Sequence, residues 1–65
     1  MEEIRQRRER QGLSRIALSR LSGVNAETIR RIEEGLVSKP HIGTTHKLEH
    51  ALQAAESRGE RGGAA

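Results

Sequence analysis

Apolar residues recur along this chain at intervals of three and four, in short stretches separated by turns that contain glycine, serine or proline. This spacing places apolar side chains on one face of a helix. The first stretch, Glu2–Gln11, is rich in helix-forming residues, and Gly12 follows it as a typical C-terminal cap. No segment has the β-branched and aromatic runs of strands. The pattern therefore predicts an all-α fold.

The second and third stretches each begin after a residue that commonly caps a helix N-terminus. Ser14 precedes the second stretch, which ends before Gly23. Asn25 precedes the third stretch, which ends at Gly35. The two predicted helices are therefore joined by the very short turn "SGVN", so that each has its own cap on either side of a glycine-containing turn.

Pro40 ends the loop "LVSKP", and we expect a fourth helix to begin between His41 and Thr45. From Glu56 onward the chain is rich in glycine and has no apolar pattern. We therefore predict one domain over residues 1–55, with four (or five) short helices, and a disordered tail over residues 56–65. The predicted core, including two hydrophobic staples before the second and third helices, consists of Ile4, Leu13, Leu18, Leu21, Val24, Ile29, Ile32, Ile42, Leu48, Ala51, Leu52 and Ala55.

The third stretch, "NAETIRRIEEG", mixes arginines with three glutamates that would repel phosphate. At about 100° per residue, Glu33 falls only about 40° from Ile29, on the buried face, whereas Glu27 points outward. A buried carboxylate needs a partner, and Arg8 shares a face of the first helix with Ile4. We predict a bidentate Arg8–Glu33 ion pair; a solvated Glu33 with local contacts is the alternative.

Composition adds charge to this picture. The 65 residues carry a net charge of +3 with a pI of about 10.6, and ten of the twelve basic residues are arginines. Arginine binds phosphate and guanine in a bidentate manner, so nucleic acid is a plausible partner. The sequence has no cysteine and hence no disulfide or thiolate metal site. We see no membrane span or signal peptide and expect a cytoplasmic location.

Taken together, these features resemble the Cro/lambda-repressor-type helix-turn-helix proteins, also called the XRE family. The shared features are "IR..RE..GLS", Ser19 and Gly23, "TI..IE.G" and the segment "KPHIGTTHKLEHAL", over about residues 4 to 52. The resemblance implies a compact bundle in which the second helix crosses the DNA backbone and the third lies in the major groove. It also implies pairing of Arg8 with Glu33. Thr45 and Glu49 depart from the Leu and Ala common in the family's fourth helix.

The resemblance implies that outward residues early in the third helix read bases. These candidates are Asn25, Ala26, Glu27, Arg30 and Arg31. Asn can read adenine, Arg can read guanine, and Glu can accept from cytosine. We favour Arg31 for a specific contact and Ala26 for an apolar one. Glu27 and Arg31 are also spaced for a surface ion pair, and such a pair could open on DNA.

Phosphate contacts are expected from Ser14 and Arg15 at the start of the second helix, and from Lys39 in the loop after the third helix. For each of these residues, simple solvation is the alternative. The cluster carries more weight than any one member.

The remaining candidate chemistry is sparse. His46 and His50 are spaced four apart and His41 is near, but zinc needs further ligands, so we expect a solvated helix face and no metal or other cofactor. No catalytic set stands out, and we expect no enzyme activity.

The leading interpretation is a bacterial or phage transcriptional regulator, a repressor or control protein. It would bind double-stranded operator DNA as a homodimer on two half-sites. The alternative is an antitoxin-like or adaptor module that uses the C-terminal tail to bind a protein partner.

Overall fold

The structure is a computed structural model that describes residues 2–64, with side chains described for residues 2–58. It contains α1 (Glu2–Arg10), α2 (Arg15–Ser22), α3 (Ala26–Glu33) and α4 (Ile42–Ala64), and no strand within residues 2–64. The predicted all-α fold is therefore confirmed, and the predicted bounds of α1, α2 and α3 agree with the structure to within two residues.

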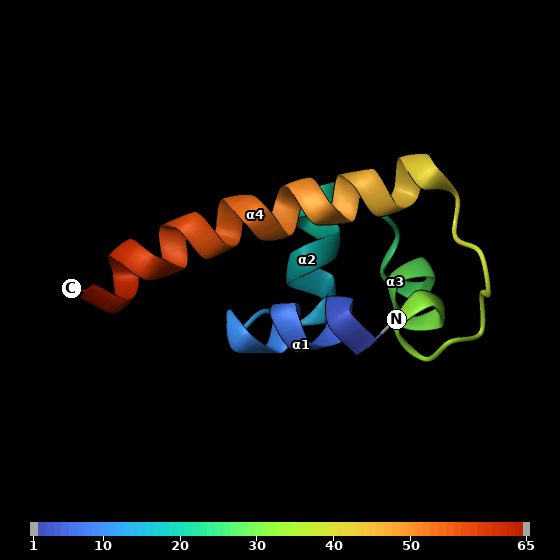
Figure 1. Ribbon diagram of the computed structural model, residues 1–65, viewed down its shortest axis with the longest axis horizontal. Coiled ribbons are helices and arrows are strands. Elements are labelled where there is room, and N and C mark those ends of the chain that lie inside the picture. Colours follow the sequence, from blue (N-terminus) through green and yellow to red (C-terminus); the bar gives the residue numbers. More distant parts are fainter. Residues whose placement is uncertain (1, 65) are drawn as a thin grey trace.

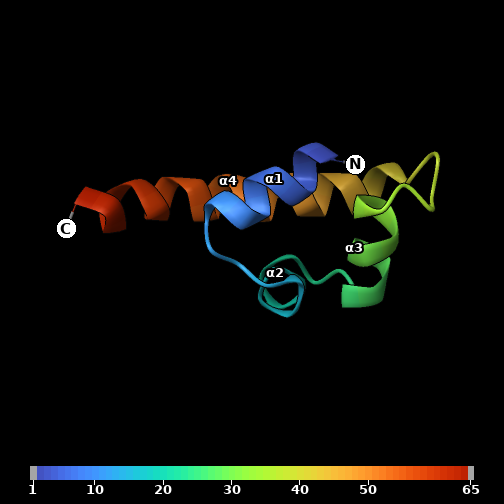
Figure 2. The same ribbon diagram turned by 90° about the horizontal axis from the view of Figure 1, so that it is seen from below.

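The long helix α4 lies beside α1, and the short helices α2 and α3 pack on the same side of that pair (Figures 1 and 2). In both views α1 and α4 run in the same general direction, and the C-terminal part of α4 continues beyond the end of α1. Helix α2 contacts both α4 and α3, while α1 bridges α4 and α3. Helices α2 and α3 are thus held against a base that both α1 and α4 supply.

One hydrophobic cluster joins all four helices. Six of its side chains are almost completely buried, with relative exposures below 2%: Ile4, Leu18, Ile29, Ile32, Leu48 and Leu52. Val24 and Ala51 complete the cluster. The prediction of burial is wrong for two residues, because Leu21 is 45% exposed and Ile42 is 81% exposed. Leu21 is close to the end of α2 and Ile42 is the first residue of α4, where a helix has begun but has few neighbours to cover its side chain.

Local hydrogen bonds cap the starts of α2 and α3 and shape the turn between them. Ser14 Oγ accepts from the Ala17 N–H at 3.0 Å, and Asn25 Oδ1 accepts from the Glu27 N–H at 2.8 Å. Gly23 has φ +77°, in the left-handed region that residues other than glycine rarely adopt. Its N–H donates to the Ser19 carbonyl at 2.8 Å. These contacts fix the start of α3 immediately after the end of α2.

Helix α4 begins at Ile42, where the His41 Nδ1 accepts from the Gly43 N–H at 3.0 Å as a cap. The helix continues to Ala64, through the stretch from residue 56 for which the sequence predicts a disordered tail. A long-range contact accounts for part of the difference, because Arg7 of α1 donates to both Glu56 carboxylate oxygens, at 2.7 and 2.9 Å. The same guanidinium donates to Glu49 at 2.6 Å, so one arginine of α1 pairs with two glutamates of α4.

Candidate nucleic-acid interface

At the base of α3, a buried carboxylate holds the helix to α1. The Glu33 side chain is 0% exposed, and the Arg8 side chain is 9% exposed. Arg8 Nε donates to Glu33 Oε2 at 2.7 Å and Nη2 donates to Oε1 at 3.0 Å, which is the bidentate geometry expected from the sequence. The Arg8 Nη1 donates to the Leu13 carbonyl at 2.8 Å. The same guanidinium therefore ties α3 to α1 and to the loop before α2.

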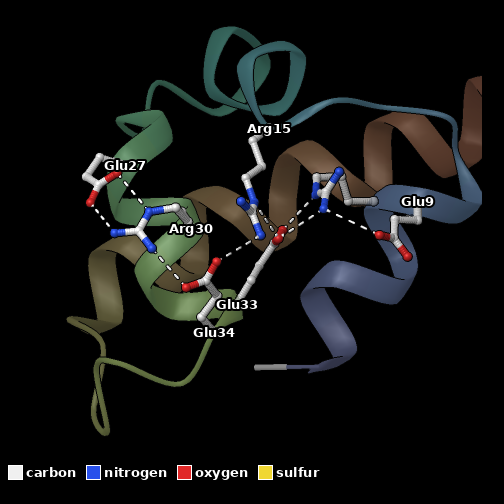
Figure 3. Close-up of polar contacts among 7 residues, drawn as sticks. Glu9, Arg15, Glu27, Arg30, Glu33 and Glu34 are labelled. Atoms are coloured by element: carbon white, nitrogen blue, oxygen red, sulfur yellow. Dashed lines mark hydrogen bonds and ion pairs between the residues drawn. The ribbon is translucent and has the colours of Figure 1, made fainter.

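A second arginine joins this pair, which the sequence did not predict. Arg15, the first residue of α2, donates from Nε to Glu33 Oε1 at 2.9 Å (Figure 3). Its Nη2 lies 3.7 Å from Glu34 Oε2. A helical wheel of α3 shows which way Glu33 points, but it carries no information on which residue of another helix reaches it. The only sequence signal was a basic residue immediately after a predicted N-cap.

The two guanidiniums decide the charge of Glu33. Burial alone would raise the pKa of this carboxyl, but hydrogen bonds from Arg8 and then Arg15 outweigh it, so the pKa lies below its ordinary value. The hydrogen bond to Glu33 raises the pKa of Arg8, against the opposing effect of its own burial. Glu33 is therefore a charged, fully paired carboxylate, and no side-chain polar atom buried in the described residues lacks a hydrogen-bond partner.

The outward face of α3 carries the candidate base readers. Asn25 and Glu27 are exposed, and Ala26 is half-buried. The Asn25 carbonyl oxygen is used in capping, so its amide NH₂ is the group that remains to donate to a base or phosphate. These three residues occupy the first turn of α3 and its cap.

Arg30 is held between two carboxylates of its own helix. It donates to both Glu27 oxygens, at 3.0 and 2.6 Å, and to Glu34 Oε1 at 2.8 Å (Figure 3). The hydrogen bond to Glu27 is the largest cause that raises the pKa of Arg30, and the hydrogen bond from Arg30 is the largest that lowers the pKa of Glu27, to about 2. The Glu27 carboxylate thus stays ionised at neutral pH, and its main partner is Arg30.

Arg31 is bound less tightly and exposed more fully. The predicted pair with Glu27 is present as a single contact, Nε to Oε2 at 3.2 Å, and the Arg31 side chain is 59% exposed. The Arg30 side chain, by comparison, is 36% exposed and makes three hydrogen bonds. Arg31 therefore breaks fewer contacts within the protein than Arg30 when its guanidinium turns toward another molecule.

The three residues predicted to contact phosphate differ in their position and in how exposed their side chains are. Ser14 is exposed and its oxygen caps α2, which leaves its hydroxyl hydrogen to donate. Lys39 is exposed in the loop between α3 and α4. Arg15 is only 33% exposed because its Nε is committed to Glu33. The structure thus places Ser14 and Arg15 together at the start of α2 and gives no contact that joins Lys39 to them.

A comparison with protein-family models matches residues 4–56 to the helix-turn-helix family HTH_3. This match covers most of the chain, from α1 into the middle of α4. The chain belongs to the helix-turn-helix family. Searches of curated proteins and of solved structures gave no significant match.

The helix-turn-helix family consists of DNA-binding regulatory domains, and the match identifies this chain as a DNA-binding domain of that type. In the family's terms, α2 and α3 are the two helices of the motif, joined by the turn at Gly23. Among the described residues, no three or more His or Glu side chains are placed to hold a metal ion. No helix in the described part of the chain is long and apolar enough to span a membrane.

Proposed function

We propose that this helix-turn-helix protein is a sequence-specific transcriptional regulator, a repressor or control protein that occupies an operator in double-stranded DNA. Helix α3 lies in the major groove, and the start of α2 contacts the backbone. The protein acts in the bacterial cytoplasm, on a bacterial or phage operator, and binds as a homodimer to two half-sites about one helical turn apart.

The observation that carries this proposal is the difference between the two faces of α3. The inward face is fixed by Ile29, Ile32 and the fully paired Glu33. The outward face presents Arg31, whose guanidinium makes a single contact of 3.2 Å and is 59% exposed. A rigidly seated helix with an adaptable guanidinium on its outer face fits direct readout, in which Arg donates to guanine O6 and N7.

Selection from a library of duplexes with a randomised centre tests the proposal. We expect the wild-type protein to enrich a short motif, and Arg31→Ala to blur one or two positions of it at a cost of about 1–3 kcal/mol. Arg58→Ala, an exposed arginine of α4, is the matched control and should leave the motif unchanged.

The opposite results are equally clear. If no motif is enriched and binding simply disappears at moderate salt, the protein is a non-specific DNA binder and the regulator proposal fails. If the protein does not bind DNA at all, the antitoxin-like or adaptor function is favoured, and the C-terminal part of α4 becomes the first segment to test for a protein partner.

A further inference from the structure

The buried carboxylate of Glu33 has one more partner than it needs. Arg8 already provides a bidentate pair, with both Glu33 oxygens engaged and both side chains shielded from solvent. The third hydrogen bond, from Arg15 Nε at 2.9 Å, brings a second positive charge to a single negative one. Each guanidinium has one further carboxylate near it, Glu34 at 3.7 Å from Arg15 and Glu9 at 3.8 Å from Arg8, and the Arg15 side chain is the more exposed of the two, at 33% against 9%.

The contacts of Arg15 use one edge of its guanidinium. A guanidinium has five N–H donors, and only the Nε–H of Arg15 makes a hydrogen bond within the described residues. The Nη2 is 3.7 Å from Glu34 Oε2, which is an ion pair beyond hydrogen-bond length. The Nη groups therefore keep donors for an anion, and the anchored Nε prevents the long side chain from sampling many rotamers.

We propose that Glu33 is a positioning residue for DNA binding, which fixes the Nε of Arg15 so that its Nη groups are pre-oriented toward a phosphate of the DNA backbone. This inference rests on the proposed DNA-binding function and adds a specific task for a core residue. Fixing a flexible arginine before binding reduces the entropy that binding would otherwise cost. In this arrangement Arg8 and Glu33 hold α3 on the core, and Glu33 and Arg15 align the backbone contact with it.

Substitution of Arg15 by lysine separates geometry from charge. Lysine keeps the positive charge but lacks the Nε–H and the planar fork. We expect Arg15→Lys to weaken binding to the duplex selected by the wild-type protein by about 5–10-fold, with little change in the dependence on salt. Arg20→Lys, an exposed arginine of the same helix, is the matched control and should change the affinity less than about twofold. Arg15→Gln should weaken binding further and lower the salt slope by about one.

A second variant tests whether Glu33 is the residue that positions Arg15. Glu33→Gln removes a negative charge, so simple electrostatics predicts tighter binding to DNA. Positioning predicts weaker binding, by about the same 5–10-fold, and no further loss when Arg15→Lys is already present. Circular dichroism establishes that each variant is folded at the temperature of the assay; if Glu33→Gln is not, the Arg15 series alone decides.

Three results would overturn the inference. Wild-type affinity in Arg15→Lys would refute positioning, because it would mean that the positive charge at position 15 is sufficient for binding. Loss of stability without loss of affinity in both Arg15 variants would make the contact purely structural. Because phosphate contacts are independent of sequence, the same series is also measured on a duplex of random sequence. Failure to select a motif then refutes only sequence-specific regulation, whereas absence of binding to any duplex refutes both proposals.

Discussion

Removal of Arg8 is the most demanding test of how this small fold is held together. Arg8→Met keeps the aliphatic part of the side chain and removes the guanidinium that pairs with Glu33 and with the Leu13 carbonyl. Glu33 then remains in a site where its side chain is 0% exposed, with Arg15 as its only hydrogen-bonding partner. The variant therefore leaves a buried charge with one hydrogen bond in place of three.

The expected loss follows from that geometry. Removing one partner of a buried ion pair costs about 3–5 kcal/mol when no compensation remains, and the surviving Arg15 contact puts this case near 3 kcal/mol. A domain of 65 residues has a free energy of unfolding of roughly 3–10 kcal/mol. Arg8→Met should therefore remove about a third of the stability at the upper end of this range and nearly all of it at the lower end.

Urea unfolding followed by far-UV circular dichroism measures this loss, since the chain has no Trp, Tyr or Phe to report by fluorescence. Arg5→Met is the control, because Arg5 pairs with Glu2 on the surface of the same helix and should contribute at most about 0.5 kcal/mol. In a Glu33→Gln background, Arg8→Met should cost only about 1 kcal/mol, which gives a coupling of about 2 kcal/mol. Equal losses for Arg8→Met and Arg5→Met, or additive effects with Glu33→Gln, would refute the argument.

Four further perturbations test this ion pair and other parts of the fold. The pKa of Glu33 lies below its ordinary 4.5, so the folded state binds fewer protons than the unfolded state as the pH falls through this range. The contribution of Glu33 to the free energy of unfolding should therefore be full at neutral pH and decrease as the pH drops below about 4.5. Urea unfolding across pH measures this decrease, which should be shallower in Glu33→Gln. Arg7→Gln should cost about 1 kcal/mol and speed amide hydrogen exchange selectively in the second half of α4, because it removes two ion pairs that span the chain. Gly23→Ala, at φ +77°, should lower the free energy of unfolding by about 1–2 kcal/mol. Gly43→Ala should cost less by the same assay, because Gly43 lies in a helix, where alanine is favoured, although its Cβ would come within 3.1 Å of the His41 ring nitrogen that accepts from the Gly43 N–H.

The features that the sequence predicted well depend on neighbouring residues. The Ser14 and Asn25 caps are formed by atoms two or three residues apart, and the left-handed Gly23 follows from the need to end one helix directly before another. The inward direction of Glu33 is also local, because helical periodicity relates it to Ile29 and Ile32 within two turns. Such features need no knowledge of how the helices pack.

The features that the sequence did not predict depend on contacts between helices. Helical periodicity predicts that Leu21 shares a buried face with Leu18. It carries no information on the packing of the other helices, which cover Leu18 and leave Leu21 exposed. The continuation of α4 past Ala55 is similar, because one side chain of α1, Arg7, supplies partners to both Glu49 and Glu56. No pattern within α4 predicts a cation at that place.

The glutamates of α3 are compatible with DNA binding because their environments differ along one chain of ion pairs. In order, this chain links Arg8, Glu33, Arg15, Glu34, Arg30, Glu27 and Arg31. At the buried end, Glu33 stays paired because separating it would leave a charge away from water. At the exposed end, pairs are screened by solvent and contribute little, so Arg31 can exchange Glu27 for a base or phosphate. Each carboxylate is flanked by two arginines, so the chain ends in a cation on the face proposed to meet DNA. The buried end therefore fixes where α3 lies, and the exposed end remains able to rearrange on binding.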